Sequence, residues 1–277
     1  MVIRAGAGPP AIRNFFVVIA NNWCTAGEFA YDRPMAVRGD LGSSTSSQLP
    51  GQSVTVLVPV GATEQHGPHL PLDTDTRIAQ ALARAVSERL AGSSAGSGGH
   101  GWPVAPAVAY GASGEHQSFA GTISIGTEAL SGLLVEYGRS ACCWAQRLVF
   151  VNGHGGNVQA LAEAVARLRF EARDVAWLPC AAADADAHAG HTETSLLLHI
   201  SPDDVRLSQA RPGNSAPLAQ LLPAMRSGGV AAVSAVGVLG DPTTATAEEG
   251  RRLFAEMVET SVAAIEQWAP GPDGMLR

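Results

Sequence analysis

The chain has 277 residues, a formal net charge of −7 and 18 basic side chains, every one of which is arginine. Because lysine is absent, enzymes that form a lysine Schiff base, phosphate-loop proteins and protein kinases are all excluded. There is no basic stripe to bind nucleic acid, and no apolar run reaches the roughly 18 residues that span a membrane.

The sequence predicts a single domain between an N-terminal extension and a short C-terminal tail. We expect residues 1–39 to form an N-terminal extension that is poorly ordered or results from a non-native start, with Met35 as a plausible native start. Residues 40–269 are predicted to form a single catalytic domain, and residues 270–277 a tail.

The four cysteines form no C-x-x-C pair, which predicts reduced thiols and a cytoplasmic protein.

The first half of the predicted domain begins with a strand. Val54–Val60 is a nearly continuous apolar run, as expected for a strand buried on both faces of a parallel sheet. A polar loop over 61–73 follows, and an apolar stripe then predicts a helix over 74–90. The Gly- and Ser-rich segment 91–99 reads as a flexible connection to a second strand near 104–109.

The second half alternates helices and strands. We expect helices over 128–147, 157–173, 216–227 and 247–268, and strands over 148–152 and 175–180. Strands that alternate with helices indicate βαβ units. The predicted fold class is therefore α/β, a three-layer αβα arrangement around a mostly parallel central sheet.

Histidines and carboxylates follow three of the predicted strands. They are Glu64, His66, His69, Asp73 and Asp75 after the first, His154 after 148–152, and His188, His191 and Glu193 after 175–180. Because the carboxyl ends of parallel strands share one edge of the sheet, these segments are expected to meet at one site.

These residue types suit a divalent transition metal. Imidazole and carboxylate ligands favour zinc, manganese or Fe(II), and the lack of cysteine in these loops argues against a closed structural zinc site. Carboxylates beyond the histidines indicate a bridged pair of metals about 3.5–4 Å apart that activates water. The alternative is a set of hydrogen-bonded residues at the sheet edge without a metal.

Two other segments allow further interpretations. Gly153–Gly156 follows a strand and opens a helix as a dinucleotide loop does, but the third glycine of that motif would fall on Val158. The polar loop 113–117, with Glu115 and His116, either lines the site or is simply solvated. No G-x-S-x-G elbow occurs, which disfavours an α/β-hydrolase.

The segment Gly61–Asp75, GATEQHGPHLPLDTD, resembles the signature of the creatininase family of metal-dependent amidohydrolases. Residues 152–157 (NGHGGN) and 188–195 (HAGHTETS) resemble the other two marks of that family, and the resemblance covers about residues 40–268. It implies a creatininase-like fold and a homo-oligomer.

The resemblance also implies ligands for two divalent ions of zinc, Fe(II) or manganese. Glu64 and His154 would hold one ion, His66 and Glu193 the other, and Asp75 would bridge them. His188 would stabilise the tetrahedral intermediate or protonate the leaving nitrogen, and Glu193 or a neighbouring carboxylate would relay the proton.

Two departures from creatininase itself concern these ligands. The glutamate two residues after the histidine that matches His154 is Gly156 here, so Glu193 takes its place as ligand. The acid beside the catalytic histidine is Ala187 here, which argues against creatinine as the substrate.

Three further segments, 41–49, 110–119 and 237–243, resemble the branch of the family that belongs to the mycofactocin system. That resemblance implies a peptidase that releases a C-terminal Val-Tyr dipeptide from the modified precursor peptide of a redox cofactor. Glu115, His116 and His191 are weaker candidates for substrate binding. Without lysine, the substrate carboxylate must be bound by arginine, protonated histidine, a main-chain nest or the metal.

Two alternative functions remain open at this point. One is a small-molecule amidohydrolase that acts on a cyclic or linear amide such as creatinine, which would use the same metal centre. The other is a non-catalytic metal-binding scaffold in a biosynthetic assembly, which would keep its metal and tolerate the loss of His188.

Overall fold

The computed structural model describes residues 39–49, 54–93, 100–182 and 185–277. These residues belong to one compact unit, Arg33–Arg277. The predictions made for residues 1–38, including the start at Met35, and most of the predicted Gly- and Ser-rich connection lie outside the described residues.

A parallel sheet forms the centre of this unit. Its strands β1 (Thr55–Val60), β2 (Arg147–Asn152) and β3 (Val175–Pro179) lie in the order β1-β2-β3. Both pairs are parallel, and their register aligns Val58 with Phe150 and Phe150 with Trp177. The three apolar runs therefore form the buried parallel strands that they predict.

The strand predicted at 104–109 is wrong, because this segment forms only isolated parallel bridges to β1. The Ala105 N–H donates to the Leu57 carbonyl and the Val108 N–H to the Pro59 carbonyl, so successive donors are three residues apart where a regular parallel ladder has two. Pro59 of β1 also has no N–H to donate back. The segment lies beside β1 as an extended stretch of chain.

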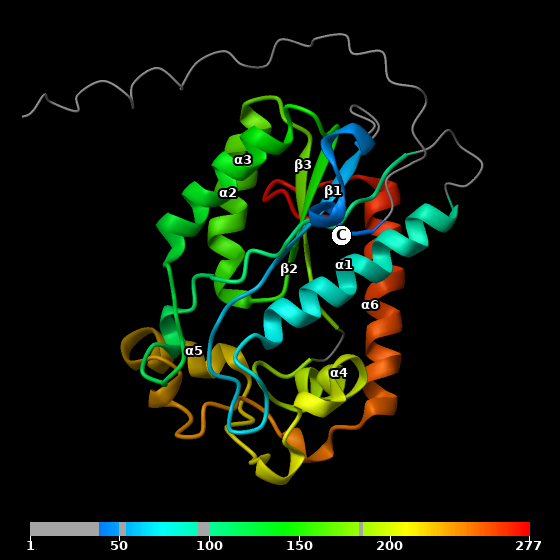
Figure 1. The fold of residues 1–277 in the computed structure, drawn as a ribbon. Helices are drawn as coiled ribbons and strands as arrows, with labels where there is room; N and C mark the ends of the chain where they lie inside the picture. Colours follow the sequence, from blue (N-terminus) through cyan, green and yellow to red (C-terminus); the bar gives the residue numbers. More distant parts are fainter. Residues whose placement is uncertain (1–38, 50–53, 94–99, 183–184) are drawn as a thin grey trace, which may run out of the picture. The chain divides into compact units, whose positions relative to one another are not determined.

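Helices cover both faces of the sheet (Figure 1). The helices α1 (Thr74–Ser93), α4 (His191–Ile200) and α6 (Ala247–Gln267) pack on one face, and α2 (Thr127–Ala141) and α3 (Val158–Phe170) on the other. Alternate strand residues divide between two cores, as the pleat requires. Leu57 and Val149 face the first group, whereas Val58 and Phe150 face the second. The predicted three-layer αβα fold is confirmed.

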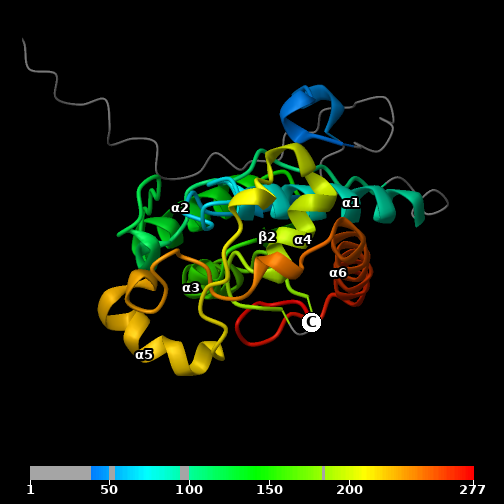
Figure 2. The ribbon, with the colours of Figure 1, turned by 90° about the horizontal axis from the view of Figure 1, so that it is seen from below.

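Several boundaries differ from the sequence prediction. Helix α2 ends at Ala141 rather than near 147, so Cys142 and Cys143 lie in the turn after it. Helix α4 is not predicted at all. The last helix before α6, α5 (Leu218–Gly228), lies away from the sheet (Figure 2). Near the C-terminus, the Leu276 N–H donates to the Trp177 carbonyl of β3.

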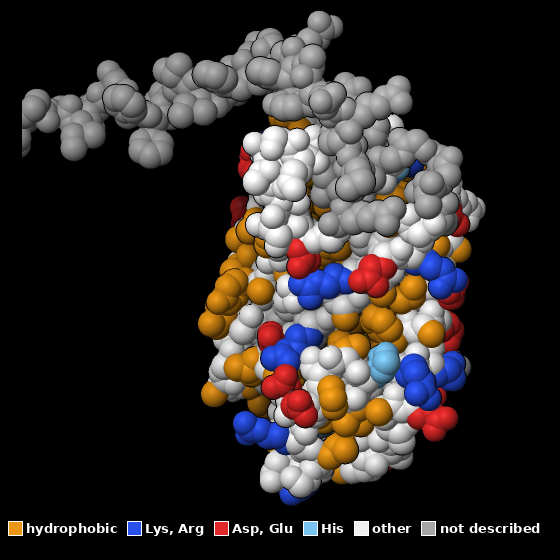
Figure 3. Space-filling view, turned by 45° about the vertical axis from the view of Figure 1, so that its right-hand side comes forward, with side chains coloured by type: hydrophobic (Ala, Val, Ile, Leu, Met, Phe, Trp, Pro, Cys, Tyr) orange, Lys and Arg blue, Asp and Glu red, His pale blue; other side chains and the backbone are white. Residues whose placement is uncertain are grey.

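The face of the molecule in Figure 3 carries both signs of charge. On the face in Figure 3, arginines and carboxylates are interspersed, and Arg84 with Asp40 is one of the surface ion pairs. Among the described residues, none of the helices combines the length and apolar character that a membrane span needs.

Candidate metal centre

Three separate segments meet where the strands end. The loop after β1 carries Glu64 and His66 and leads into Asp75 in the first turn of α1. The loop after β2 carries His154. The segment after β3 carries His188 and continues into α4, which holds Glu193 in its first turn. All of these side chains except Glu193 are buried, and Glu64 and His66 are fully so.

Two glycines allow the strand ends to approach α1 this closely. A Cβ atom on Gly153 would lie 2.3 Å from the carbonyl oxygen of Asp75, and one on Gly61 would lie 2.3 Å from Thr76 Oγ1. Any larger residue would push the loops after β1 and β2 away from the helix that presents Asp75. The glycines therefore bring the two loops within reach of one carboxylate.

Asp75 lies at the centre of the cluster, with each oxygen facing a different histidine. Its Oδ1 is 3.0 Å from His66 Nε2, and its Oδ2 is 3.4 Å from His154 Nδ1. Two further carboxylates flank these rings. Glu64 Oε2 is 3.3 Å from His154 Nε2, and Glu193 Oε2 is 3.9 Å from His66 Nε2.

The donor atoms of the cluster fit a metal centre. Both carboxylate oxygens of Glu64, Asp75 Oδ2 and His154 Nε2 are buried, and none of them has a hydrogen-bond partner among the described residues. Buried charges of this kind are normally paired or coordinate a metal. Three triplets of the described residues have ligand atoms within 4.8 Å of one another: Glu64–His66–Asp75, His66–His188–Glu193 and Glu64–His116–His188. These overlapping triplets are consistent with a binuclear site.

The charges of the cluster shift its protonation strongly. Burial acts to lower the pKa of His66, but the charge and hydrogen bond of Asp75 outweigh it and raise that pKa to about 10. Burial raises the pKa of Glu193 to about 7, although the His66 charge opposes this. The negative charge of Glu64 likewise raises the pKa of His154 against its burial. In the absence of metal, protons therefore partly neutralise the crowded carboxylates.

The pKa values of the other two histidines of the cluster, His116 and His188, are lowered. Burial, reinforced by the charge of His154, lowers the pKa of His116 to about 4. Burial and the charges of His66 and His116 hold the pKa of His188 well below its usual value. Both rings are therefore neutral at physiological pH.

These shifts predict that metal binding strengthens as pH rises. Bound metal must displace the protons of His66 and His154, whose pKa values are both raised, and below about pH 7 also that of Glu193. Apparent affinity should therefore rise with pH, and more steeply below pH 7 than above it. Zinc calorimetry on chelator-treated protein, in buffers that differ in ionisation enthalpy, measures the protons released. A pH-independent affinity without proton release would contradict this prediction.

A cavity of about 300 Å³ opens onto the cluster. Asp75, His154, His188 and Glu193 line one part of it. Another part is apolar and consists of Leu218, Leu222 and Met225 of α5 together with Ala187 and Leu239. The cavity therefore combines metal-binding side chains with an apolar wall.

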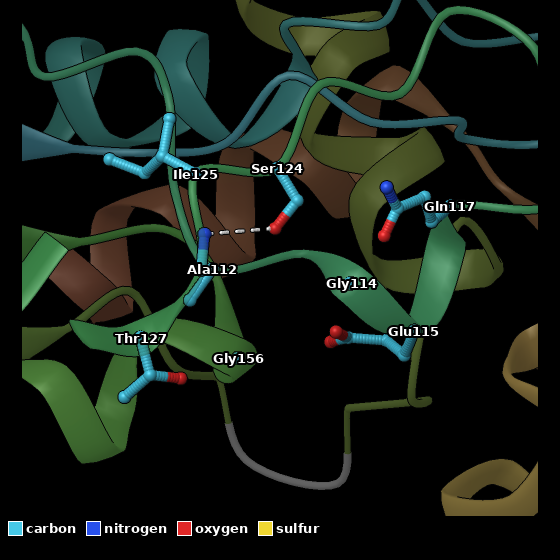
Figure 4. A pocket seen from close by; sticks show the side chains of 9 residues that line it. Ala112, Gly114, Glu115, Gln117, Ser124, Ile125, Thr127 and Gly156 are labelled. Carbon is cyan, nitrogen blue, oxygen red and sulfur yellow. Dashed lines mark hydrogen bonds between the residues drawn. The ribbon is translucent and has the colours of Figure 1, made fainter. Parts of the chain in front are cut away.

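A second cavity of about 480 Å³ shares Glu115 and Gly156 with the first. Figure 4 shows Glu115 at its edge, with the polar side chains of Gln117, Ser124 and Thr127 around it. The two cavities meet beside His154, whose Nε2 lies 3.5 Å from Glu115 Oε1. A substrate longer than a single small ring has space on both sides of this junction.

Glycine at position 156 is required for this arrangement. A Cβ atom there would lie 2.5 Å from His154 Nε2 and 2.8 Å from Glu115 Oε1. The residue that departs from the creatininase pattern is thus the one that makes room for the Glu115 carboxylate beside His154.

The remaining candidates divide between the cluster and its surroundings. His116 is buried beside Glu64, with 3.4 Å between Nε2 and Oε1. His191 instead lies outside both cavities, and its Nδ1 is 2.8 Å from Thr244 Oγ1. His69 contacts Thr194, and Asp73 pairs with Arg77. Four of the histidines considered therefore belong to the cluster: His66, His116, His154 and His188.

Sequence reasoning missed two contributors to the site. Gln65 lies between two ligand candidates in the sequence and contacts both His116 and His188. The apolar wall on α5 was missed because no strand precedes it, so the rule that ligands bind at strand ends does not reach it. Its Leu218, Leu222 and Met225 have the 4- and 3-residue spacing of one helix face, which was the available signal.

Residues 42–265 match the family profile described as "Creatininase: Creatinine amidohydrolase". The chain belongs to the creatininase family. It is 66% identical over 247 residues to the mycofactocin precursor peptide peptidase of Mycobacterium ulcerans (strain Agy99), covering 89% of this chain and 98% of the relative.

Solved structures agree with this assignment. A structure described as a manganese creatininase is 25% identical with a TM-score of 0.68, over 85% of this chain and 100% of that one. A zinc–zinc form of a creatininase variant is 26% identical with a TM-score of 0.63, over 79% and 92%. The chain is therefore a hydrolase of the creatininase family, with buried His, Glu and Asp clusters consistent with a binuclear metal site.

Proposed function

We propose that the chain is a metal-dependent peptidase that cleaves the modified mycofactocin precursor peptide near its C-terminus, releases a Val-Tyr dipeptide and so acts in redox cofactor biosynthesis. The observation that carries this proposal is the 66% identity to a mycofactocin precursor peptide peptidase over 98% of that relative. The cavity at the metal cluster and the neighbouring cavity that shares Glu115 and Gly156 with it support a substrate of peptide length.

The side chains that would hold two divalent ions are those of the cluster. Glu64 and His154 suit one ion, His66 and Glu193 the other, and Asp75 presents an oxygen toward each histidine. When bound, zinc, Fe(II) or manganese polarises an amide carbonyl and makes a nearby water more acidic. The printed descriptions of the two solved relatives name manganese and zinc, which supports metals of this class.

His188 is the group best suited to move a proton in this site. It lines the cavity, it is neutral, and its Nδ1 lies 3.6 Å from Glu64 Oε1. A neutral imidazole there can accept a proton from water and deliver it to the leaving nitrogen. Glu115 stays ionised because the nearby His154 lowers its pKa against its burial, so its carboxylate can orient a polar group at the junction of the cavities.

The apolar wall on α5 predicts a preference for a bulky apolar side chain next to the cleaved bond. Leu222→Ala should lower kcat/KM for a peptide with valine beside that bond by about tenfold, because methylene-scale pocket contacts contribute 1–3 kcal/mol. The effect should shrink for a peptide with alanine there. Leu133→Ala, an exposed leucine of α2, is the matched control. An equal loss for both peptides would argue against a side-chain contact.

The residues that line the two cavities limit which groups can bind the peptide carboxylate. In the part of the chain that the structure describes, no arginine lines either cavity at the cluster. The other groups expected to bind that carboxylate in a protein that lacks lysine are protonated histidine, main-chain N–H groups and the metal.

The function is tested by product analysis. The purified protein, reconstituted separately with zinc, iron and manganese, is incubated with the modified precursor peptide, and the products are weighed by mass spectrometry. Release of the C-terminal dipeptide supports the proposal. An intact peptide together with hydrolysed creatinine would favour the small-amide hydrolase, and metal binding without either activity would favour the scaffold.

We further propose a cytoplasmic homo-oligomer. The thiols of Cys142 and Cys180 are free, as expected in a reducing compartment. The resemblance to creatininase supports the homo-oligomer, and the exposed apolar side chains of Phe170 and Ile123 are available for a contact between copies. Light scattering after size-exclusion chromatography gives the oligomeric state.

A further inference from the structure

Gln65 is buried between Glu64 and His66, and both ends of its side chain are anchored to the backbone. Its Oε1 accepts from the Gly67 N–H at 2.9 Å, and its Nε2 donates to the Gly237 carbonyl at 3.0 Å. A backbone N–H can only donate and a carbonyl can only accept, so these two contacts fix the orientation of the amide. The NH₂ group must therefore face the rings of His116 and His188.

The protonation of His116 follows from this orientation. Gln65 Nε2 lies 2.8 Å from His116 Nδ1 and donates to it. A neutral imidazole that accepts at Nδ1 carries its proton at Nε2. His116 Nε2 is the ring nitrogen nearest to Glu64, 3.4 Å from Oε1. Although His116 lies at ligand-like spacing from Glu64 and His188, it therefore turns a nitrogen that carries a proton, and not a lone pair, toward that carboxylate.

The protonation of His188 follows from counting hydrogens. Its Nε2 lies 2.8 Å from the backbone carbonyl of Gln65 and 3.1 Å from Gln65 Nε2. The two hydrogens of Gln65 Nε2 are already directed to His116 and to Gly237. His188 Nε2 therefore carries a proton and donates a hydrogen bond to the carbonyl. Nδ1 is then the ring nitrogen that can gain or lose a proton, and it lies 3.6 Å from Glu64 Oε1.

The two rings thus share one tautomer but turn different nitrogens toward Glu64, Nε2 of His116 and Nδ1 of His188. They lie close together, with ring centroids 4.3 Å apart. The nearby backbone keeps the arrangement tight, because a Cβ atom on Gly237, which has a positive φ of 79°, would lie 1.9 Å from Gln65 Oε1. Only glycine lets this loop close over the amide.

We propose that Gln65 is a positioning residue that holds His116 and His188 in the Nε2–H form and leaves His188 Nδ1 as the nitrogen that exchanges a proton in the reaction. As far as the reaction is concerned, the inference rests on the proposed peptidase function. His188 Nδ1 takes one proton from the attacking water as the C–O bond forms. It gives that proton to the leaving nitrogen as the C–N bond breaks, so the imidazole ends neutral. The other water proton leaves when the new carboxylic acid ionises.

The tautomers can be measured without any activity. Long-range ¹H–¹⁵N correlation spectra of the full chain with ¹⁵N-labelled histidine, recorded at pH 7.5 with zinc as the only metal, distinguish the two tautomers. His116→Asn and His188→Asn assign the signals. Both histidines should show the Nε2–H pattern in the unmodified protein. A proton on Nδ1 of His116 would overturn the proposal, and this result does not depend on whether a variant folds.

Gln65→Glu replaces the donor by a carboxylate that can only accept. His116 should then carry a proton on Nδ1, whereas His188 should keep its Nε2–H because it bonds to the backbone of residue 65. In the peptide assay, kcat should fall at least tenfold with KM changed less than twofold. Gln209→Glu, at an exposed position, adds the same charge as a control.

An unchanged His116 pattern in a folded Gln65→Glu variant would refute the positioning role. If the unmodified protein cleaves no peptide, the proposed function fails, while the spectra still decide the tautomers.

Discussion

Asp75→Asn is expected to remove hydrolysis, with kcat/KM lowered by at least about 10³-fold, because a metal centre supplies several kcal/mol to the transition state. Asparagine keeps the shape of the side chain but loses the charge. It also turns an amide nitrogen toward either His66 or His154, which now face the two Asp75 oxygens at 3.0 and 3.4 Å. Metal content should fall together with activity.

The measurement is metal analysis by mass spectrometry alongside steady-state kinetics. Asp203→Asn, an exposed aspartate outside both cavities, should retain its metal and activity. Circular dichroism checks that the fold survives. A variant with full activity and an undiminished metal content would rule out a bridging role for Asp75.

The sheet could be predicted from the sequence because its three strands are nearly continuous apolar runs. Such runs are typical of strands that are covered on both faces, and β1, β2 and β3 are of this kind. The segment 104–109 is apolar too, but its pairing with β1 shifts by one residue, and Pro59 of β1 lacks an N–H that a ladder needs. Apolar character alone therefore overestimates the sheet by one strand.

Helix α4 was missed for a different reason. It is only ten residues long, and polar residues and a glycine precede it. Its start is stabilised from a distance, since Asp186 accepts hydrogen bonds from the N–H groups of His191 and Thr192. A cap five residues upstream is not the local signal that marks most helix starts.

The site was predictable in its location and less so in its details. The rule that strand ends share an edge brings Glu64, His154 and His188 together correctly. The rule says nothing about side-chain direction, however. His188 and His191 are three residues apart, yet one enters the cluster and the other contacts Thr244. The role of Gln65 depends on the direction of individual hydrogen bonds, which no sequence pattern encodes.

His188→Gln is expected to lower kcat by about 10²–10⁴-fold, the usual contribution of a general acid–base group, while metal content stays unchanged. Glutamine can still donate from its Nε2 to the backbone carbonyl of Gln65, which His188 contacts at 2.8 Å, but it offers no basic nitrogen in place of Nδ1. His199→Gln, on the exposed side of α4, is the matched control.

Metal content and activity of His188→Gln, compared with those of Asp75→Asn, show whether His188 is a metal ligand or the proton carrier. The geometry alone is compatible with both roles. His188 forms one of the ligand-spaced triplets with His66 and Glu193, so loss of metal in His188→Gln would make it a ligand. Loss of activity with full metal content would make it the proton carrier. Its Nε2 is tied to the backbone, so only Nδ1 is free, and a nitrogen permanently bound to metal could not also carry the proton. The two measurements on one variant therefore decide between these roles.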